Sequence, residues 1–538
     1  MFVEGNLVDI HLQEIYPARL VISKNRIIEI IRVNKKLEGF ILPGFIDAHV
    51  HIESSLLSPI EFGRIALSHG TIGVVSDPHE IANVCGVDGV CFMIEEGRRS
   101  RLKFNWTAPS CVPATEMETS GAVLDDKDIE FLLGIPEIVA LGEMMNFPGV
   151  INGDELVLKK CALAGKFNKV IDGHAPGLSG DKLAKYISYG ISSDHECSTI
   201  DEALEKINLG MRVLIREGSS AKNFRALFPL MISHAEKVML CSDDLHADDL
   251  IRGHINLLVK RSLELGIPLF NILKIVTQNP VEFYGLPIGM LRMNDFADFI
   301  FVDNLTDFNI LQTWVDGVLV ERTDDFCKLF KLKRTINNFN ASHVEESELV
   351  IVPSGKMCRV IEVEDGELST KASFFPIGKN FDYFLHENEI QKLFVKNRYD
   401  NSCVSKALVK GFGPMKGAFA SSVAHDSHNI IAIGDDLTDV SNAINEVISH
   451  KGGISYSIYG ESLFLALPIG GLMSDDSAED VSARYLKISE YIREHGCRLN
   501  SPVMTLSFLA LLVIPELKLS DKGLFDFQSF SFTNTFFD

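Results

Sequence analysis

The chain has 538 residues, of which 46% are hydrophobic, and this is enough apolar material for two or three globular domains. Its formal net charge of -22 disfavours nucleic-acid backbones and anionic membrane surfaces as partners, and it suits a small neutral or cationic substrate. The ten cysteines include no Cys-x-x-Cys pair, so neither a disulfide framework nor a thiolate zinc site is indicated. We expect a globular cytoplasmic protein without a signal peptide or a membrane span.

The first 335 residues begin and end with segments that have the same sequence pattern. Residues 1–40 alternate apolar and polar residues in short bursts between turn-forming residues, and residues 297–322 do the same. Such alternation is typical of small antiparallel strands. We therefore predict one discontinuous small β-sandwich domain, made of residues 1–45 and 286–335.

The middle, residues 46–285, repeats a short apolar run that ends in polar residues and is followed by a helix-like stretch. Eight such units over this length predict a (β/α)8 TIM-like barrel. The eight runs end near His51, Asp77, Pro113, Glu143, His174, His195, Glu217 and Asp243. Beyond an Asn/Thr-rich linker at 335–340, strand-like runs and glycine-rich turns predict a separate C-terminal α/β domain over 340–538.

The first apolar run of the middle ends in two histidines, His49 and His51. In an extended strand, residues i and i+2 point to the same side, so both rings can bind one cation. Active sites of parallel barrels lie at the carboxyl ends of the strands, where these histidines are expected. Taken alone, a His-x-His pair is more often a surface feature.

Six residues at predicted strand ends have the side chains that a metal pair needs. They are His49, His51, Glu143, His174, His195 and Asp243. Imidazole and carboxylate without thiolate suit manganese, ferrous iron or zinc, and Glu143 is placed to bridge two ions. For single residues ordinary alternatives stay open, such as a helix cap at Asp243 and a core histidine at His174.

The segment Pro-Gly-Phe-Ile-Asp-Ala-His-Val-His at 43–51 resembles the first barrel strand of the amidohydrolase superfamily. The resemblance to the adenine deaminase family extends over nearly the whole chain. It rests on Ser-Asp-Pro-His-Glu-Ile at 76–81, Gly-Glu-Met-Met-Asn at 142–146, Asp-Gly-His-Ala-Pro-Gly at 172–177, Ser-Asp-His-Glu at 193–196, Arg-Glu-Gly-Ser at 216–219, Ser-Asp-Asp at 242–244, Gly-Pro-Met-Lys-Gly at 413–417 and His-Asp-Ser-His-Asn-Ile at 425–430.

The resemblance implies hydrolytic deamination of adenine to hypoxanthine and ammonia in purine salvage, with water activated by a binuclear Mn²⁺ or Fe²⁺ centre. The fourth strand end has Glu143 where better-known binuclear amidohydrolases carry a carbamylated lysine. Two alternatives remain: an amidohydrolase that acts on another aminopurine or a cyclic amide, and a non-catalytic scaffold. The scaffold is disfavoured because every expected ligand is present. Whether the chain forms a homo-oligomer stays open.

Three acidic residues are candidates for proton transfer. Asp243 is expected to take a proton from the attacking water, and Glu217 to donate one to a ring nitrogen. A salt bridge of Glu217 with Arg216 or Arg212 is an equal alternative. Asp244 is expected to accept a hydrogen bond from the N7 side of the purine, with a helix cap as its alternative.

Three further histidines are predicted to bind substrate: His79, His425 and His428. For His79, as for Glu53, a supporting role behind the ligands or an accessory metal contact is equally open. His425 and His428 lie in a stretch whose glycines, hydroxyls and imidazoles favour closing over a ligand. A turn stabilised by Asp426 and Ser427 is the alternative.

Overall fold

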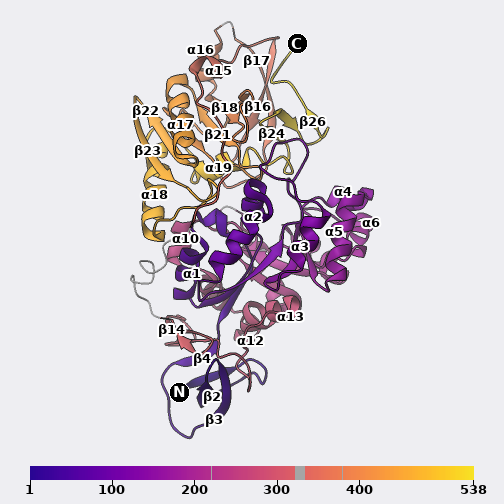
Figure 1. Ribbon diagram of the computed structural model, residues 1–538, viewed down its shortest axis with the longest axis vertical. Helices are drawn as coiled ribbons and strands as arrows, with labels where there is room; N and C mark the ends of the chain where they lie inside the picture. Colours follow the sequence, from indigo (N-terminus) through magenta and orange to yellow (C-terminus); the bar gives the residue numbers. More distant parts are fainter. Residues whose placement is uncertain (220, 321–333, 379) are drawn as a thin grey trace. The chain divides into compact units, whose positions relative to one another are not determined.

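A computed structural model describes residues 1–219, 221–320, 334–378 and 380–538 (Figure 1). The chain divides into two compact units. The first contains residues 1–78, 91–110 and the described part of 125–331, and the second contains 79–90, 111–124 and the described part of 332–538. Helix α2 (His79–Gly97) begins in the second unit and ends in the first. The predicted domain boundaries do not anticipate this interleaving.

The two β-rich flanks meet in one seven-stranded sheet of the first unit. Its order is β15-β14-β13-β4-β1-β2-β3, so strands from both flanks are direct neighbours. The bounds are β1 (Phe2–Asp9), β2 (Glu14–Ser23), β3 (Arg26–Arg32), β4 (Phe40–Pro43), β13 (Phe299–Val302), β14 (Ile310–Val315) and β15 (Val318–Leu319). The rings of Phe299 and Trp314 stack 5.4 Å apart in its core. A sandwich arrangement stays a prediction, and residues 321–333 of the predicted 286–335 segment lie outside the described residues.

The middle of the first unit contains eight parallel strands. They are β5 (Phe45–Val50), β6 (Thr71–Ser76), β7 (Lys103–Ala108), β8 (Ile138–Met144), β9 (Val170–Gly173), β10 (Ser193–Asp194), β11 (Arg212–Arg216) and β12 (Val238–Cys241). Strands β5 to β9 form one sheet and β10 to β12 another. Isolated bridges pair Ile171 with Ile191 and Val50 with Asp243, between β9 and β10 and between β5 and β12. The α/β class is confirmed.

Helices follow these strands, and several start at side-chain caps. Thr199, for example, accepts a hydrogen bond from the Glu202 amide, and helix α7 behind it buries Ala203 and Ile207. The helical elements are η1 (Ile52–Ser55), α1 (Pro59–Ser68), α3 (Asp126–Leu133), α4 (Phe147–Asn152), α5 (Glu155–Lys166), α6 (Gly180–Ser188), α7 (Ile200–Asn208), α8 (Phe224–Leu227), α9 (Leu230–Ser233), η2 (Ala235–Lys237), α10 (Ala247–Arg252), α11 (Ile255–Glu264), α12 (Leu269–Leu273), η3 (Lys274–Gln278) and α13 (Asn279–Tyr284).

The second unit is built on a nine-stranded sheet of order β17-β16-β19-β18-β21-β20-β22-β23, with β27 paired to β16. Its bounds are β16 (Met357–Glu362), β17 (Lys371–Pro376), β18 (Ile390–Lys396), β19 (Ser405–Lys410), β20 (Ala418–Ser421), β21 (Ile430–Gly434), β22 (Gly453–Ile458), β23 (Glu461–Ala466) and β27 (Phe536–Phe537). Strands β24 (Leu517–Ser520), β25 (Gly523–Asp526) and β26 (Ser531–Phe532) form a small sheet.

The helices of the second unit are α15 (Glu346–Leu349), α16 (Phe381–Glu387), α17 (Leu437–His450), α18 (Ala478–Glu494) and α19 (Pro502–Phe508). Helix α17 packs on β20, β21 and β22, and buries Val440, Ile444 and Val447 there. Within the described part of the chain, every helix is too short or too polar to cross a membrane.

Candidate active site

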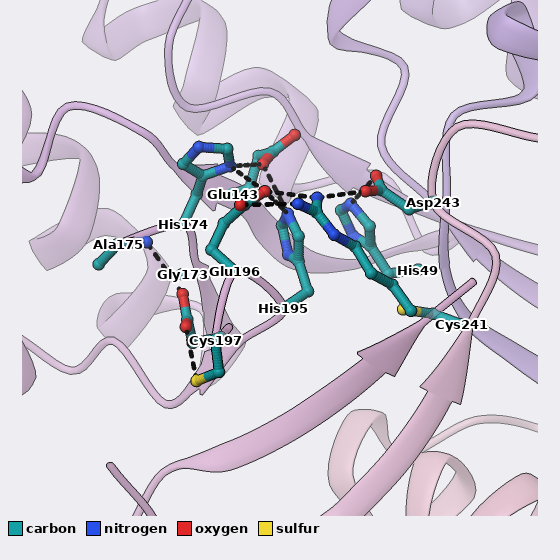
Figure 2. Close-up of polar contacts among 12 residues, drawn as sticks. His49, Glu143, Gly173, His174, Ala175, His195, Glu196, Cys197, Cys241 and Asp243 are labelled. Carbon is teal, nitrogen blue, oxygen red and sulfur yellow. Dashed lines mark hydrogen bonds and ion pairs between the residues drawn. The ribbon is translucent and has the colours of Figure 1, made fainter. Parts of the chain in front are cut away.

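The six predicted metal ligands converge at the carboxyl ends of strands in the first unit. His49 lies in β5 and Glu143 in β8, whereas His51, His174 and His195 directly follow β5, β9 and β10. Asp243 lies two residues beyond β12. All are at least nine-tenths buried except His174, which is half-buried. Figure 2 shows His49, His174, His195, Glu143 and Asp243 turned toward one another.

The donor atoms of this cluster lie at spacings typical of ligands around shared cations. Nε2 of His51 is 3.3 Å from Oε1 of Glu143 and 3.2 Å from Oδ1 of Asp243. Nε2 of His195 is 3.2 Å from Oε2 of Glu143, and Nε2 of His49 is 3.6 Å from Oδ1 of Asp243. Three overlapping triplets, His49/His195/Asp243, His49/His51/Glu143 and Glu143/His174/His195, each have their donor atoms within 4.8 Å of one another. An imidazole and carboxylate set without thiolate fits divalent first-row metals.

Two buried aspartates hold the ligand-bearing strands in place. Oδ2 of Asp77 accepts a hydrogen bond from the Glu143 amide at 3.0 Å, and the carbonyl of Asp77 lies 3.0 Å from Nδ1 of His51. With Nδ1–H donating to that carbonyl, Nε2 of His51 keeps its lone pair for a metal. Asp47 accepts from the Ser242 amide at 3.0 Å and lies 2.8 Å from Nε2 of His254. This contact fixes the chain beside Asp243.

Arg216, at the end of β11, joins two acidic residues of the cluster. Its Nη2 donates to Oε2 of Glu196 at 2.8 Å, and its Nη1 donates to Oδ2 of Asp243 at 2.6 Å. Oε1 of Glu196 also lies 3.5 Å from ring nitrogens of His174 and His195. The guanidinium therefore neutralises charge on one face of the cluster.

Burial and the neighbouring charges set the protonation states. Burial, with the nearby His195 and His51, holds the pKa of His49 well below its ordinary value, so this ring is a neutral ligand. Burial alone would raise the pKa of Glu143, but the facing His174, His195 and His51 outweigh it and keep Glu143 ionised. Burial likewise opposes ionisation of Asp243, and Arg216 and the histidines reverse the effect. For His195, Glu143 overcomes burial and raises the pKa to about 9.

The remaining predicted catalytic residues have partners of their own. Glu217 accepts a hydrogen bond from Arg261 at 2.5 Å, so its ion pair is with neither Arg212 nor Arg216. Asp244 accepts from the Ser54 hydroxyl at 2.5 Å. Helix α10 has His246 at its N-cap, so neither Asp243 nor Asp244 caps it. Glu53 is buried in η1.

The three histidines predicted to bind substrate lie in the second unit. His79 begins α2, and His425 and His428 lie in the loop between β20 and β21. Nε2 of His79 is 3.8 Å from Oδ1 of Asp426, and Glu80 faces both other histidines. The structure therefore brings these three residues together around acidic partners, and their contact with substrate stays a prediction.

Sequence reasoning did not select three residues of these clusters, Glu196, Arg216 and Glu80. Two of them have a sequence signal, because Glu196 directly follows His195 and Glu80 directly follows His79. Arg216 was considered as a salt-bridge partner for Glu217, but the side chain of Glu217 pairs with Arg261 instead. The bond of Arg216 to Asp243 depends on the parallel pairing of β11 with β12, a nonlocal feature.

Comparison with known proteins identifies the family. Residues 40–320 match the amidohydrolase family, and residues 368–531 match the adenine deaminase C-terminal domain. The chain is 47% identical to an adenine deaminase from Sulfurovum sp., with 99% of each chain covered. It is 45% identical to one from Borreliella burgdorferi, with 99% of each covered. It is also 46% identical to one from Salinibacter ruber, with 100% of this chain and 99% of that one covered. The chain therefore belongs to the adenine deaminase family, and to the amidohydrolases that use divalent metal ions.

Proposed function

We propose that the chain hydrolyses adenine to hypoxanthine and ammonia at the cluster around Glu143. The observation that supports this most directly is the convergence of four imidazoles and two carboxylates from five strand ends. Nitrogen atoms of His49, His51 and His195 lie 3.2–3.6 Å from carboxylate oxygens of Glu143 or Asp243. Full-length similarity to adenine deaminases supports adenine as the substrate. The alternatives, another aminopurine or a non-catalytic scaffold, have no observation in their favour.

The donor set suits two divalent ions, Mn²⁺ or Fe²⁺. His49, His51, Glu143, His174, His195 and Asp243 would hold these ions. When bound, such ions lower the pKa of water toward about 7 and so supply hydroxide at neutral pH. Behind the ligands, Asp77 orients the His51 ring and the Glu143 backbone, and Asp47 fixes the chain beside Asp243.

Asp243 is proposed to take the proton from the attacking water. Its carboxylate is ionised, and its Oδ1 faces Nε2 of His51 at 3.2 Å. The guanidinium of Arg216 holds the other oxygen, which fixes the orientation of the carboxylate. The proton is then available to the departing amino group, which leaves as ammonia.

Glu217 and Asp244 are proposed to act on the purine itself. Glu217 would donate a proton to a ring nitrogen and so offset the negative charge that hydroxide attack places on the ring. That role requires Glu217 to be protonated and to exchange Arg261 for substrate. The proton lost from the C6 hydroxyl as hypoxanthine forms would restore the proton of Glu217. Asp244, held by Ser54 beside Asp243, would accept a hydrogen bond from the N7 side.

The assay is release of ammonia and hypoxanthine from adenine by purified, manganese-loaded protein. We expect Glu143→Gln to lose activity, because a neutral amide is a much weaker ligand for divalent ions than a carboxylate. Glu387→Gln, at the end of α16, is the matched control and should retain full activity. A panel with guanine, cytosine and cyclic amides separates the alternatives. Activity on another base with none on adenine would refute the substrate assignment, and inactivity on every compound would favour the scaffold.

We also propose that the eight parallel strands close into a (β/α)8 barrel. The two isolated bridges, Ile171 with Ile191 and Val50 with Asp243, support closure because they link the edges of the five-stranded and three-stranded sheets. A cytoplasmic location is supported by the cysteines, since the nine in the described part of the chain form no disulfide.

A further inference from the structure

We propose that the second unit has a divalent cation site of its own, formed by Glu80, His425 and His428. Glu80 lies in the first turn of α2, and the histidines lie in the loop between β20 and β21. All three belong to the second unit, and none is one of the six predicted ligands named above. Their exposed fractions are 1%, 5% and 0%, so the cluster is shielded from solvent.

The spacing of the donor atoms supports an ion between them. Nδ1 of His425 is 3.5 Å from Oε1 of Glu80, and Nε2 of His428 is 3.9 Å from Oε2. Both distances exceed a hydrogen bond. An ion bonded at about 2.1 Å to such atoms keeps its ligands roughly 3 to 4 Å apart. The three residues have their donor atoms within 4.8 Å of one another, as do the triplets of the active site.

The rings are fixed in orientations that face Glu80. The His425 ring stacks on Phe508 with centroids 4.5 Å apart and planes 6° from parallel. Nε2 of His428 is fully buried and has no hydrogen-bond partner among the described residues. Burial, with the nearby His425 and Arg398, holds the pKa of His428 well below its ordinary value, so the ring is neutral. A buried neutral imidazole with an unpartnered nitrogen is a competent ligand.

The surroundings are rich in acidic groups, which favours a cation. Asp426 lies next to His425, and burial together with Asp426 raises the pKa of Glu118 to about 8. Arg398 is the opposing charge near His428. Two imidazoles and one carboxylate suit zinc, manganese or ferrous iron. The ion would join the start of α2 to the β20–β21 loop, two segments far apart in the sequence.

One contact favours a metal-free alternative. The Ala424 amide lies 3.3 Å from Nδ1 of His428. A neutral ring that accepts there carries its proton on Nε2, facing Glu80. Ion binding at Nε2 moves the proton to Nδ1 and gives up this long contact. The alternative is therefore a polar network, or a surface that binds substrate as the sequence suggests.

The number of manganese ions bound per chain decides between the cation site and these metal-free alternatives. Full-length protein is stripped with chelator, saturated with MnCl₂, freed of unbound ion and analysed for manganese per chain. We expect Glu80→Gln and His428→Gln each to bind one ion fewer than wild type. The control His343→Gln, an exposed histidine of the same unit that contacts Ser449, should bind as many as wild type.

A second pair of variants separates this site from the active site. His49→Ala/His195→Ala should retain one manganese, and adding Glu80→Gln should remove it. This difference persists even if the deaminase proposal fails. Circular dichroism checks that each variant is folded. The site is refuted if folded Glu80→Gln binds as much manganese as wild type, or if the double variant binds none. Lower turnover of the His428 variant with unchanged manganese would also refute it and would favour substrate binding.

Discussion

Arg216 joins two buried carboxylates of the active-site cluster, so its removal should disturb that cluster. Its guanidinium bonds to Glu196 and Asp243, and its side chain is 11% exposed. In metal-free protein, Arg216→Met leaves both carboxylates buried without this partner. We expect a loss of about 3 kcal/mol in the free energy of unfolding, measured by urea denaturation. After reloading with manganese, turnover should fall at least about tenfold, since Asp243 loses its fixed orientation.

The control for Arg216 is an exposed ion pair in the second unit. Arg484 contacts Asp476 at 2.8 Å with half of its side chain exposed, so Arg484→Met should cost less than about 0.5 kcal/mol. Arg216→Lys should fall between wild type and Arg216→Met, because an ammonium group cannot reproduce the guanidinium fork. Equal stability of Arg216→Met and Arg484→Met would contradict the importance of the network.

Lys518 predicts a pH dependence of stability. Burial lowers its pKa from 10.5 to about 7, and its Nζ donates to the carbonyls of Leu368 and Phe508. Between pH 7 and 9 the unfolded chain binds this proton and the folded chain largely does not, so stability rises with pH. The gain is about 2 kcal/mol, or roughly 2 °C in Tm for a chain of this length.

The measurement compares Tm at pH 7 and pH 9 for wild type, Lys518→Met and the exposed control Lys487→Met. Wild type and the control should gain more from the higher pH than Lys518→Met does. Other groups titrate equally in all three proteins, so the difference isolates Lys518. Identical changes in Tm would show that Lys518 is protonated in the folded chain at pH 9.

At this scale the sequence anticipated which residues converge better than it anticipated their partners. Strand alternation placed His49 and His51 together, and positions at strand ends placed Glu143, His174 and His195 beside them; their binding of metal stays a prediction. Glu196 and Arg216 could not be assigned, because their bonds depend on how strands far apart in sequence pair and on side-chain direction. Glu217 was given two possible partners, and Arg261, from α11, is neither of them.

At the scale of elements, strand β8 has a glycine, Gly142, at a position where a larger side chain would collide with Asp77. A Cβ at Gly142 would lie 2.4 Å from Oδ2 of Asp77, the atom that accepts from the Glu143 amide. Gly142→Ala should therefore displace Asp77 and turn Glu143, with a cost of about 1–3 kcal/mol. We expect a lower manganese content and lower turnover, measured by elemental analysis and the ammonia assay.

Gly165→Ala in α5 is the matched control, because a Cβ there meets nothing within 4 Å. It should leave activity unchanged and raise stability by about 0.5–1 kcal/mol, since alanine has the higher helix propensity. If Gly142→Ala retained full manganese and turnover, the contact between Asp77 and Glu143 would be irrelevant to the site.

Strand ends were predicted closely where a short apolar run stops at polar residues. Seven of the eight predicted ends lie within two residues of an observed strand end. The third differs, because β7 ends at Ala108 and the prediction was Pro113. Pro109 explains the early end, since proline has no amide hydrogen to donate to a neighbouring strand. The apolar residues that follow belong to an irregular segment of the second unit.

At the scale of the whole molecule, the two units are interleaved in sequence. Residues 79–90 and 111–124 belong to the second unit, although they lie between strands of the first. In 111–124, the Thr119 amide donates to Asp521 at 2.9 Å and its carbonyl accepts from Asn429 at 2.9 Å. The periodicity of the sequence could not reveal this, because these segments are short and their partners are some 300 to 400 residues away.

This interleaving predicts that the second unit cannot be removed by a single cut. A chain of residues 1–320 leaves 79–90 and 111–124 without their partners and exposes the buried side chains of Ile81, Val84 and Leu124 to water. We expect this fragment to be aggregation-prone and to be cleaved by trypsin and chymotrypsin first within 79–124, as mass spectrometry of the products will show. Co-expression with a second chain of residues 334–538 should restore resistance to cleavage, because it returns the partners of both segments. A fragment 1–320 that is monomeric and resists proteolysis as well as the full chain does would contradict the assignment of these segments to the second unit. The ammonia assay on that fragment would then show whether the first unit deaminates adenine alone.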